Sequence, residues 1–125
     1  MSDFWKSIVD FFDIEFDKPP KFIYKFNKDF IKSQWFVGSK ISYSKNIFKN
    51  ENIISPAIKY QSEDGKYLEI SWNSLKQKTL ELQQILINNN IKIGDRVVGY
   101  CSNTPDVIAA FLAANSLGAI WSSCS

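Results

Sequence analysis

The chain has 125 residues, 45% of them hydrophobic and 15% aromatic, with a formal net charge of +2. This length suits one domain of ordinary size. The lysines are dispersed among acidic residues, which argues against a nucleic-acid or anionic-membrane partner, and the absence of histidine removes the commonest general base and metal ligand.

Cysteine usage and the apolar runs bear on the compartment. Cys101 and Cys124 lie in apolar, strand-like stretches, so we expect small buried thiols in a reducing compartment, although their spacing leaves a disulfide open. No apolar run is long enough to cross a bilayer. Asp3 precedes the first apolar stretch, which is atypical of a signal peptide. The predicted location is the cytoplasm.

The first 14 residues predict an amphipathic helix over 2–14. Trp5, Ile8, Val9 and Phe12 recur at helical spacing, and Ser2 or Asp3 could cap the helix. A surface helix for a membrane or a partner is one interpretation, but few lysines lie on its polar face. We therefore favour packing onto the body of its own protein.

Residues 16–30 predict an extended surface loop, because Pro19-Pro20 breaks a helix and no clear period follows. Its lysines alternate with aromatic residues. A nucleic-acid patch is the weaker interpretation, since lysine stems commonly cover aromatic packing.

The next aromatic residue, Trp35, also falls in a predicted loop. We expect it to be an anchor buried against residues 53–86 rather than a ligand contact.

The middle of the chain predicts a hairpin followed by a helix. Residues 53–60 and 67–71 read as strands joined by a turn with Asp64-Gly65 at its tip. A helix over 73–87 follows, with Ser71 as its N-cap. The helix residues expected to face a sheet are Leu75, Thr79, Leu82 and Leu86.

Residues 91–125 predict a βαβ unit with parallel strands and a right-handed crossover. The strands are expected at 96–101 and 119–124. Pro105 begins the helix between them and Gly118 ends it. Residues 107–117 are apolar on almost every side, so we expect this helix to be covered all round.

Candidate chemistry is sparse. The sequence has no phosphate-binding glycine loop, no metal-ligand cluster and no hydroxyl paired with a base. Ser122, Ser123 and Ser125 are interpreted first as strand-end packing and second as the rim of a cavity. The stretch Asn103-Thr104-Pro105 is interpreted first as a helix cap and second as a ligand contact. No catalytic, cofactor-binding or metal-binding residue is assigned.

Three stretches carry a resemblance to a known family. They are Phe4-Trp5 with Asp10-Phe11-Phe12, WFVGSKISYSKNIF from Trp35, and GDRVVGYCSNTPDVIAAFLAANSLGAIWSSCS from Gly94. Together they resemble the early part of acyl-CoA synthetases of the acyl-adenylate-forming superfamily. The final GAIWSSCS is similar to acetoacetyl-CoA synthetases within it. Ser42 and Lys45 depart from the asparagine and glutamate usual in the second stretch.

The resemblance implies an α/β fold, namely an incomplete N-terminal part of an acyl-adenylate-forming enzyme. Residues 1–50 would be a helical and loop extension packed on a partial βαβ sheet. Residues 51–125 would begin the AMP-binding (adenylation) domain and be truncated.

The implied parent enzyme is a ligase that joins acetoacetate to ATP, giving an acyl-adenylate and diphosphate, after which CoA displaces AMP to form acetoacetyl-CoA. It would use ATP, CoA and Mg²⁺, none of which is expected to bind this fragment well. The expected partner is the remainder of the synthetase chain, and the fragment alone is expected to be inactive. Two alternatives stay open: a fragment of another short-chain acyl-CoA synthetase, and a freestanding non-catalytic α/β interaction module.

Overall fold

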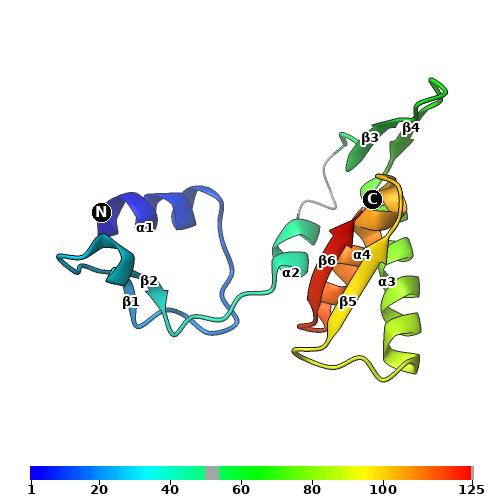
Figure 1. Cartoon of the computed structure of the whole chain (residues 1–125). Coiled ribbons are helices and arrows are strands. Elements are labelled where there is room, and N and C mark those ends of the chain that lie inside the picture. The colour runs from blue at the N-terminus through cyan, green and yellow to red at the C-terminus, as the bar shows by residue number, and fades with distance from the viewer. Residues whose placement is uncertain (50–53, 125) are drawn as a thin grey trace. The chain divides into compact units, whose positions relative to one another are not determined.

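The computed structural model describes residues 1–49 and 54–124. The chain forms two compact units, Met1–Ser42 and Tyr43–Ser125, which are described separately (Figure 1). It mixes helices with small sheets, as predicted for an α/β chain. The functional division at residue 50 and the packing of the extension on the sheet stay predictions.

The first unit contains one helix, one short 3-10 helix and a two-stranded antiparallel sheet. Its elements are α1 (Ser2–Phe11), β1 (Phe22–Lys25), η1 (Phe30–Lys32) and β2 (Gln34–Val37). Tyr24 in β1 lies opposite Trp35 in β2. The prediction of a loop over 16–30 was therefore wrong for β1, and Trp35 also lies in a strand. Aromatic and β-branched residues favour a strand there, and the alternating lysines conceal the pattern.

Helix α1 begins at Ser2 as predicted, but its cap and its end differ from the prediction. Met1 is the N-cap and makes no side-chain hydrogen bond, so capping by Ser2 or Asp3 was wrong. The helix ends at Phe11, before the predicted residue 14. Phe12 consequently lies outside the helix and is exposed. The rest of the predicted apolar stripe is half-buried, and consists of Trp5, Ile8 and Val9.

The second unit holds the hydrophobic core and most of the regular structure. Its elements are α2 (Tyr43–Phe48), β3 (Ile58–Gln61), β4 (Tyr67–Ile70), α3 (Trp72–Asn88), β5 (Arg96–Tyr100), α4 (Pro105–Ser116) and β6 (Ile120–Cys124). Strands β3 and β4 form the predicted antiparallel hairpin. The tip residue Gly65 has φ +83°, a conformation that glycine adopts readily. Strand β3 begins later than predicted, after Pro56, while Ile53 lies outside the described residues.

Helix α3 starts as predicted but packs differently. The Ser71 hydroxyl accepts a hydrogen bond from the Ser74 backbone N–H at 3.1 Å and so caps the helix. The inner face of α3 lies mainly against α4, not against the sheet. Leu75 of α3 packs with Ala109 and Leu112 of α4 in the hydrophobic core. Small alanine side chains let the two helices approach closely.

The predicted βαβ unit is present, with β5 and β6 paired in parallel from Arg96↔Ile120 to Tyr100↔Cys124. Figure 1 shows both strands in front of α4, which covers one face of this sheet. The fully buried positions of α4 are Ala109, Leu112, Ala113 and Ala114. Its Ile108 is exposed, so the expectation that α4 is covered all round was only partly correct.

Helix α2 was not predicted, and one buried serine fastens it to α4. The Ser44 hydroxyl donates to the Leu112 carbonyl at 2.6 Å. The Ser44 backbone N–H donates to the Asn115 side-chain oxygen at 3.3 Å. Tyr43 also pairs its ring with Phe111 of α4. A short helix gains its stability from such tertiary contacts rather than from its own propensity, so sequence periodicity alone gave no signal for α2.

The βαβ sheet depends on a glycine beneath an aromatic ring. A Cβ at Gly99 would stand 2.7 Å from Cη2 and Cζ2 of Trp121 on the neighbouring strand. Real side-chain carbons do not approach so closely, and an indole ring cannot bend away. The space above Gly99 is therefore filled by Trp121, and the two positions depend on each other.

Gly99→Ala should lower the free energy of unfolding by about 1–3 kcal/mol, the usual cost of overpacking. Chemical denaturation of the purified chain measures this change. In a Trp121→Leu background the same substitution should cost much less, because the ring that it meets is gone. An equal cost in both backgrounds would show that the contact with Trp121 is not the cause.

Candidate functional site

A cleft of the second unit lies at the carboxyl end of β5. Its volume is about 580 Å³, and it is lined by residues 60–64 of the β3–β4 hairpin and by residues 102–104 after β5. The carboxyl ends of parallel strands are where α/β folds place ligands. The local sequence predicted both turns, but only the fold brings them together.

The lining of this cleft is polar and negatively charged. It includes the carboxylates Glu63 and Asp64 but no lysine or arginine. The Ser62 hydroxyl donates to Asp64 and lowers the pKa of that carboxyl, and a backbone hydrogen bond from Lys66 lowers it further. Asp64 is therefore held as an anion. Such a lining opposes the binding of a polyphosphate, because like charges repel.

A smaller cleft of about 220 Å³ lies where α3 meets the start of α4. Lys78 and Asp106 line it and form an ion pair, with the lysine Nζ 3.6 Å from a carboxylate oxygen. The positive charge of Lys78 is thus already matched. In the larger cleft the Ser62 hydroxyl does contact a carboxylate, that of Asp64, but the lowered pKa of Asp64 makes it a weak base.

The structure separates the sequence-predicted candidates. Asn103 and Thr104 line the larger cleft, and Pro105 lines the smaller one. Thr104 is the N-cap of α4 but caps it without a side-chain hydrogen bond. The remaining serines lie elsewhere or are undescribed: Ser122 and Ser123 are exposed on β6 and line neither cleft, and Ser125 lies outside the described residues.

Trp35 lies in the first unit. Its ring is half-buried and packs with Tyr24 and Phe30, at centroid distances of 5.3 and 5.5 Å. The anchoring role is therefore supported within its own unit. Contact with residues 53–86 stays a prediction.

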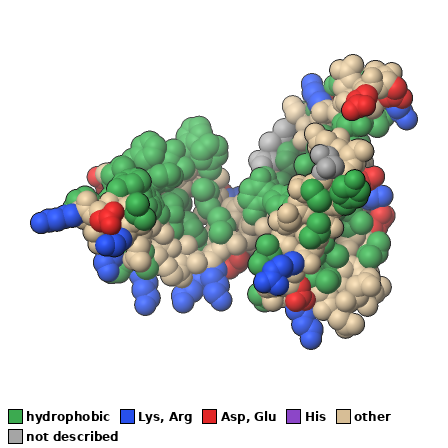
Figure 2. Space-filling view, viewed as in Figure 1, with side chains coloured by type: hydrophobic (Ala, Val, Ile, Leu, Met, Phe, Trp, Pro, Cys, Tyr) green, Lys and Arg blue, Asp and Glu red, His purple; other side chains and the backbone are tan. Residues whose placement is uncertain are grey.

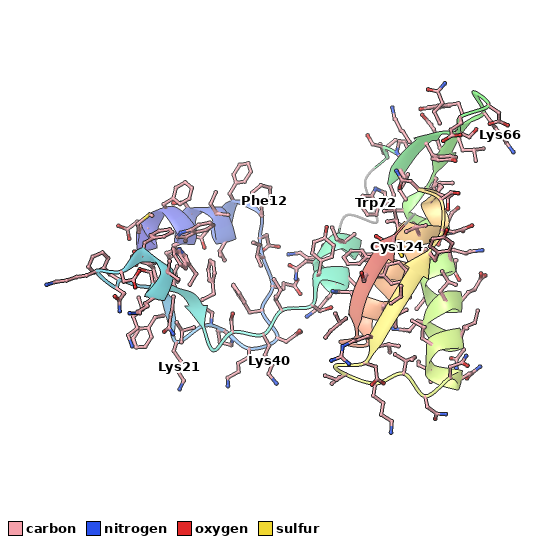
Figure 3. All side chains as sticks on the ribbon, viewed as in Figure 1. Phe12, Lys21, Lys40, Lys66, Trp72 and Cys124 are labelled. Carbon is pink, nitrogen blue, oxygen red and sulfur yellow. The ribbon has the colours of Figure 1, made fainter. Side chains whose placement is uncertain are left out.

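The expectation of buried thiols was wrong. Cys101 and Cys124 are both free and exposed (Figure 3 labels Cys124). Cys124 lies on the face of the sheet that α4 does not cover, and Cys101 follows the end of β5, so their apolar neighbours in the sequence do not bury them. Cys124 is in register with Tyr100, whereas the Cys101 sulfur lies 3.3 Å from the place of a Cβ at Gly99. Alternation along β5 therefore directs the two side chains to opposite faces, which disfavours a disulfide.

Within residues 1–49 and 54–124, no three His, Cys, Asp or Glu side chains gather so as to hold a metal ion. Across that same part of the chain, no helix has the length and apolarity needed to cross a membrane.

Comparisons with known proteins show that this chain is similar to one part of much longer proteins. No protein-family model matches the sequence. Acetoacetyl-CoA synthetase of Macaca fascicularis is 32% identical over 127 residues, covering 99% of this chain and 19% of the relative. That of Gallus gallus is 38% identical over 94 residues, covering 74% of this chain and 14% of the relative. The solved acetoacetyl-CoA synthetase of Streptomyces lividans is 28% identical, with a TM-score of 0.87 over 98% of this chain and 19% of that one. The chain thus spans less than a fifth of the length of these relatives.

Proposed function

Because this chain belongs by sequence and by fold to the acetoacetyl-CoA synthetase family, we propose that it supplies one segment of an acetoacetate–CoA ligase. The ligase would convert acetoacetate, ATP and CoA to acetoacetyl-CoA, AMP and diphosphate. The segment supplied by this chain would be structural. The reacting groups would come from the rest of the synthetase polypeptide. One observation carries this proposal: almost the whole chain aligns with 19% of the Macaca fascicularis synthetase and with 19% of the Streptomyces lividans enzyme.

The chemistry of the chain supports a segment without reacting groups of its own. Stabilising charge on the phosphates of ATP needs positive side chains, Mg²⁺ or a glycine-rich loop. The larger cleft offers two carboxylates instead, and Lys78 at the smaller cleft is already paired with Asp106. The charge of this lining does not fit the phosphates of ATP or CoA. Among the described residues no three His, Cys, Asp or Glu side chains gather so as to hold a metal ion, so no reaction step is assigned to them.

Incubated with acetoacetate, ATP, Mg²⁺ and CoA, the chain alone should release no diphosphate above a heat-denatured control. The physical reason is the lack of groups that position ATP and stabilise its developing charge. A coupled diphosphate assay measures the result, with the intact Streptomyces lividans enzyme as the positive control. Turnover by the chain alone would contradict a purely structural segment.

A second arm of the assay tests the positive claim. The chain is mixed with the Streptomyces lividans polypeptide that remains after its matching stretch is removed. Acetoacetate-dependent diphosphate release should appear only in the mixture. Release with acetate or propionate but not with acetoacetate would favour another short-chain acyl-CoA synthetase. If the mixture releases no more diphosphate than either polypeptide alone, the result would favour the non-catalytic interaction module.

A further inference from the structure

Helix α1 of the first unit lies against the β1–β2 hairpin through few contacts. It spans only ten residues, and none of them is fully buried. Its inner stripe of Trp5, Ile8 and Val9 is half-buried. Phe4 and Phe11 stay exposed, and Figure 2 shows hydrophobic side chains gathered on the side of the unit where α1 lies. An isolated helix of this length is marginal in water, so α1 depends on its contacts with the hairpin.

The main contact of α1 with the hairpin is made by Phe36 of β2. The ring centroid of Phe36 lies 6.0 Å from that of Trp5 in α1 and 5.9 Å from that of Phe16. The backbone of Phe36 has φ +47°, in the left-handed region that a bulky side chain rarely adopts. Helix α1 is therefore held by a residue whose backbone is under strain.

The turn that follows α1 is strained in the same way. Asp13 has φ +47°. Its backbone N–H donates to the Asp10 carbonyl at 3.2 Å, and the Ile14 N–H donates to the Val9 carbonyl at 3.0 Å. These two hydrogen bonds form a turn that commonly ends a helix, and glycine usually occupies its left-handed position. Aspartate takes that conformation less readily than glycine, so the docked path of the chain costs strain here too.

The hairpin has contacts of its own that do not involve α1. Tyr24 of β1 lies opposite Trp35 of β2, and the Trp35 ring packs with Tyr24 and Phe30. Among the described residues, this group of rings shares no member with the group formed by Phe36, Trp5 and Phe16. Losing the second group would therefore leave the first group and the paired strands in place.

We propose that α1 is a hinged strap, which leaves the hairpin as a unit by a change of backbone conformation at Asp13. Opening releases Phe36 from its strained conformation and uncovers the apolar stripe of α1, while β1 and β2 stay paired. Strain at two positions and the lack of a fully buried residue keep the closed state only slightly favoured. The strap is a property of the first unit and does not depend on the proposed ligase function.

Hydrogen exchange of the full chain, followed by NMR, tests whether α1 moves separately. In the wild type the hydrogen-bonded amides of α1 should exchange at least tenfold faster than those of β1 and β2, because a local opening needs less free energy than unfolding of the unit. Phe36→Ala should speed exchange in α1 about tenfold further, since the ring contact is lost, without a matching change in β1. Phe26→Ala is the matched control, because Phe26 is 72% exposed, and it should leave α1 unchanged.

Two variants at Asp13 test the hinge. Asp13→Gly and Asp13→Ala both remove the carboxylate together with its contacts, so the difference between them isolates the backbone. Glycine accepts φ +47°, whereas alanine resists it. The amides of α1 should therefore exchange about fivefold or more slowly in Asp13→Gly than in Asp13→Ala, with equal exchange of β1 and β2 in both variants.

Three results would overturn the strap. One is a common exchange rate for α1 and the hairpin in the wild type, because the unit would then open as a whole. Another is equal exchange of α1 in the two Asp13 variants, which would remove the hinge. The third is loss of protection in β1 along with α1 in Phe36→Ala, or the same acceleration of α1 in Phe26→Ala, since either would show that the Phe36 ring does not hold α1 alone.

Discussion

Leu112→Ala should lower the free energy of unfolding of the second unit by about 2–5 kcal/mol, the range for emptying a leucine site in a core. Leu112 is only 2% exposed and is the largest fully buried side chain of the described residues. It packs with Leu75 and Ala109 where α3 meets α4. Its small alanine neighbours cannot move in to fill the space, so a cavity remains. Urea denaturation gives the loss from the shift in midpoint at unchanged slope.

Leu80→Ala is the matched control for this prediction. It removes the same atoms from the neighbouring helix α3, but Leu80 is 46% exposed. Its expected cost is below about 1 kcal/mol, as for surface changes in general. If the two substitutions cost the same, the α3–α4 contact would not be the core of this unit.

Trp35→Ala should destabilise the first unit by about 3 kcal/mol, the lower end of the range for aromatic-to-alanine changes. The lower end applies because Trp35 is half-buried. Its ring nevertheless joins Tyr24 of β1 and Phe30 of η1, and this unit has no fully buried hydrophobic side chain among its described residues. Hydrogen exchange of the β1 and β2 backbone amides measures the loss for this unit separately.

Trp35→Phe separates the ring from its N–H group. Trp35 Nε1 is buried and has no hydrogen-bond partner among the described residues. A donor without an acceptor adds no hydrogen-bond energy to the folded state. Removing it should therefore lower the free energy of unfolding by less than about 1 kcal/mol. Exchange as fast in Trp35→Phe as in Trp35→Ala would show that the indole makes a bond that the structure lacks.

Local signals in the sequence predicted local structure well. Asp64-Gly65 predicted the hairpin, Ser71 the start of α3, and Gly118, at φ +70°, the end of α4. Each depends on the conformational or capping preference of one or two residues. Those preferences act over a few neighbouring positions, which is why they can be read without a structure.

The features that the sequence did not predict are those that depend on contacts between residues distant in the sequence. Strand β1 is held by β2 across the hairpin, and α2 by hydrogen bonds from Ser44 to α4. The cysteines were expected to be buried because their neighbours are apolar, but burial depends on which layers are present. The larger cleft was likewise missed, because its two turns are about 40 residues apart in the sequence and meet only in the folded unit.

The bond from Ser44 to Asn115 spans 71 residues, and this span bears on the order of folding. Closing a long loop costs entropy before its contacts can form, whereas α3 and α4 lie close in sequence. Helix α2 should therefore join last, onto an α3–α4 pair that has already formed. By the same reasoning it should detach first, so its amides should exchange through a local opening well below the global unfolding free energy.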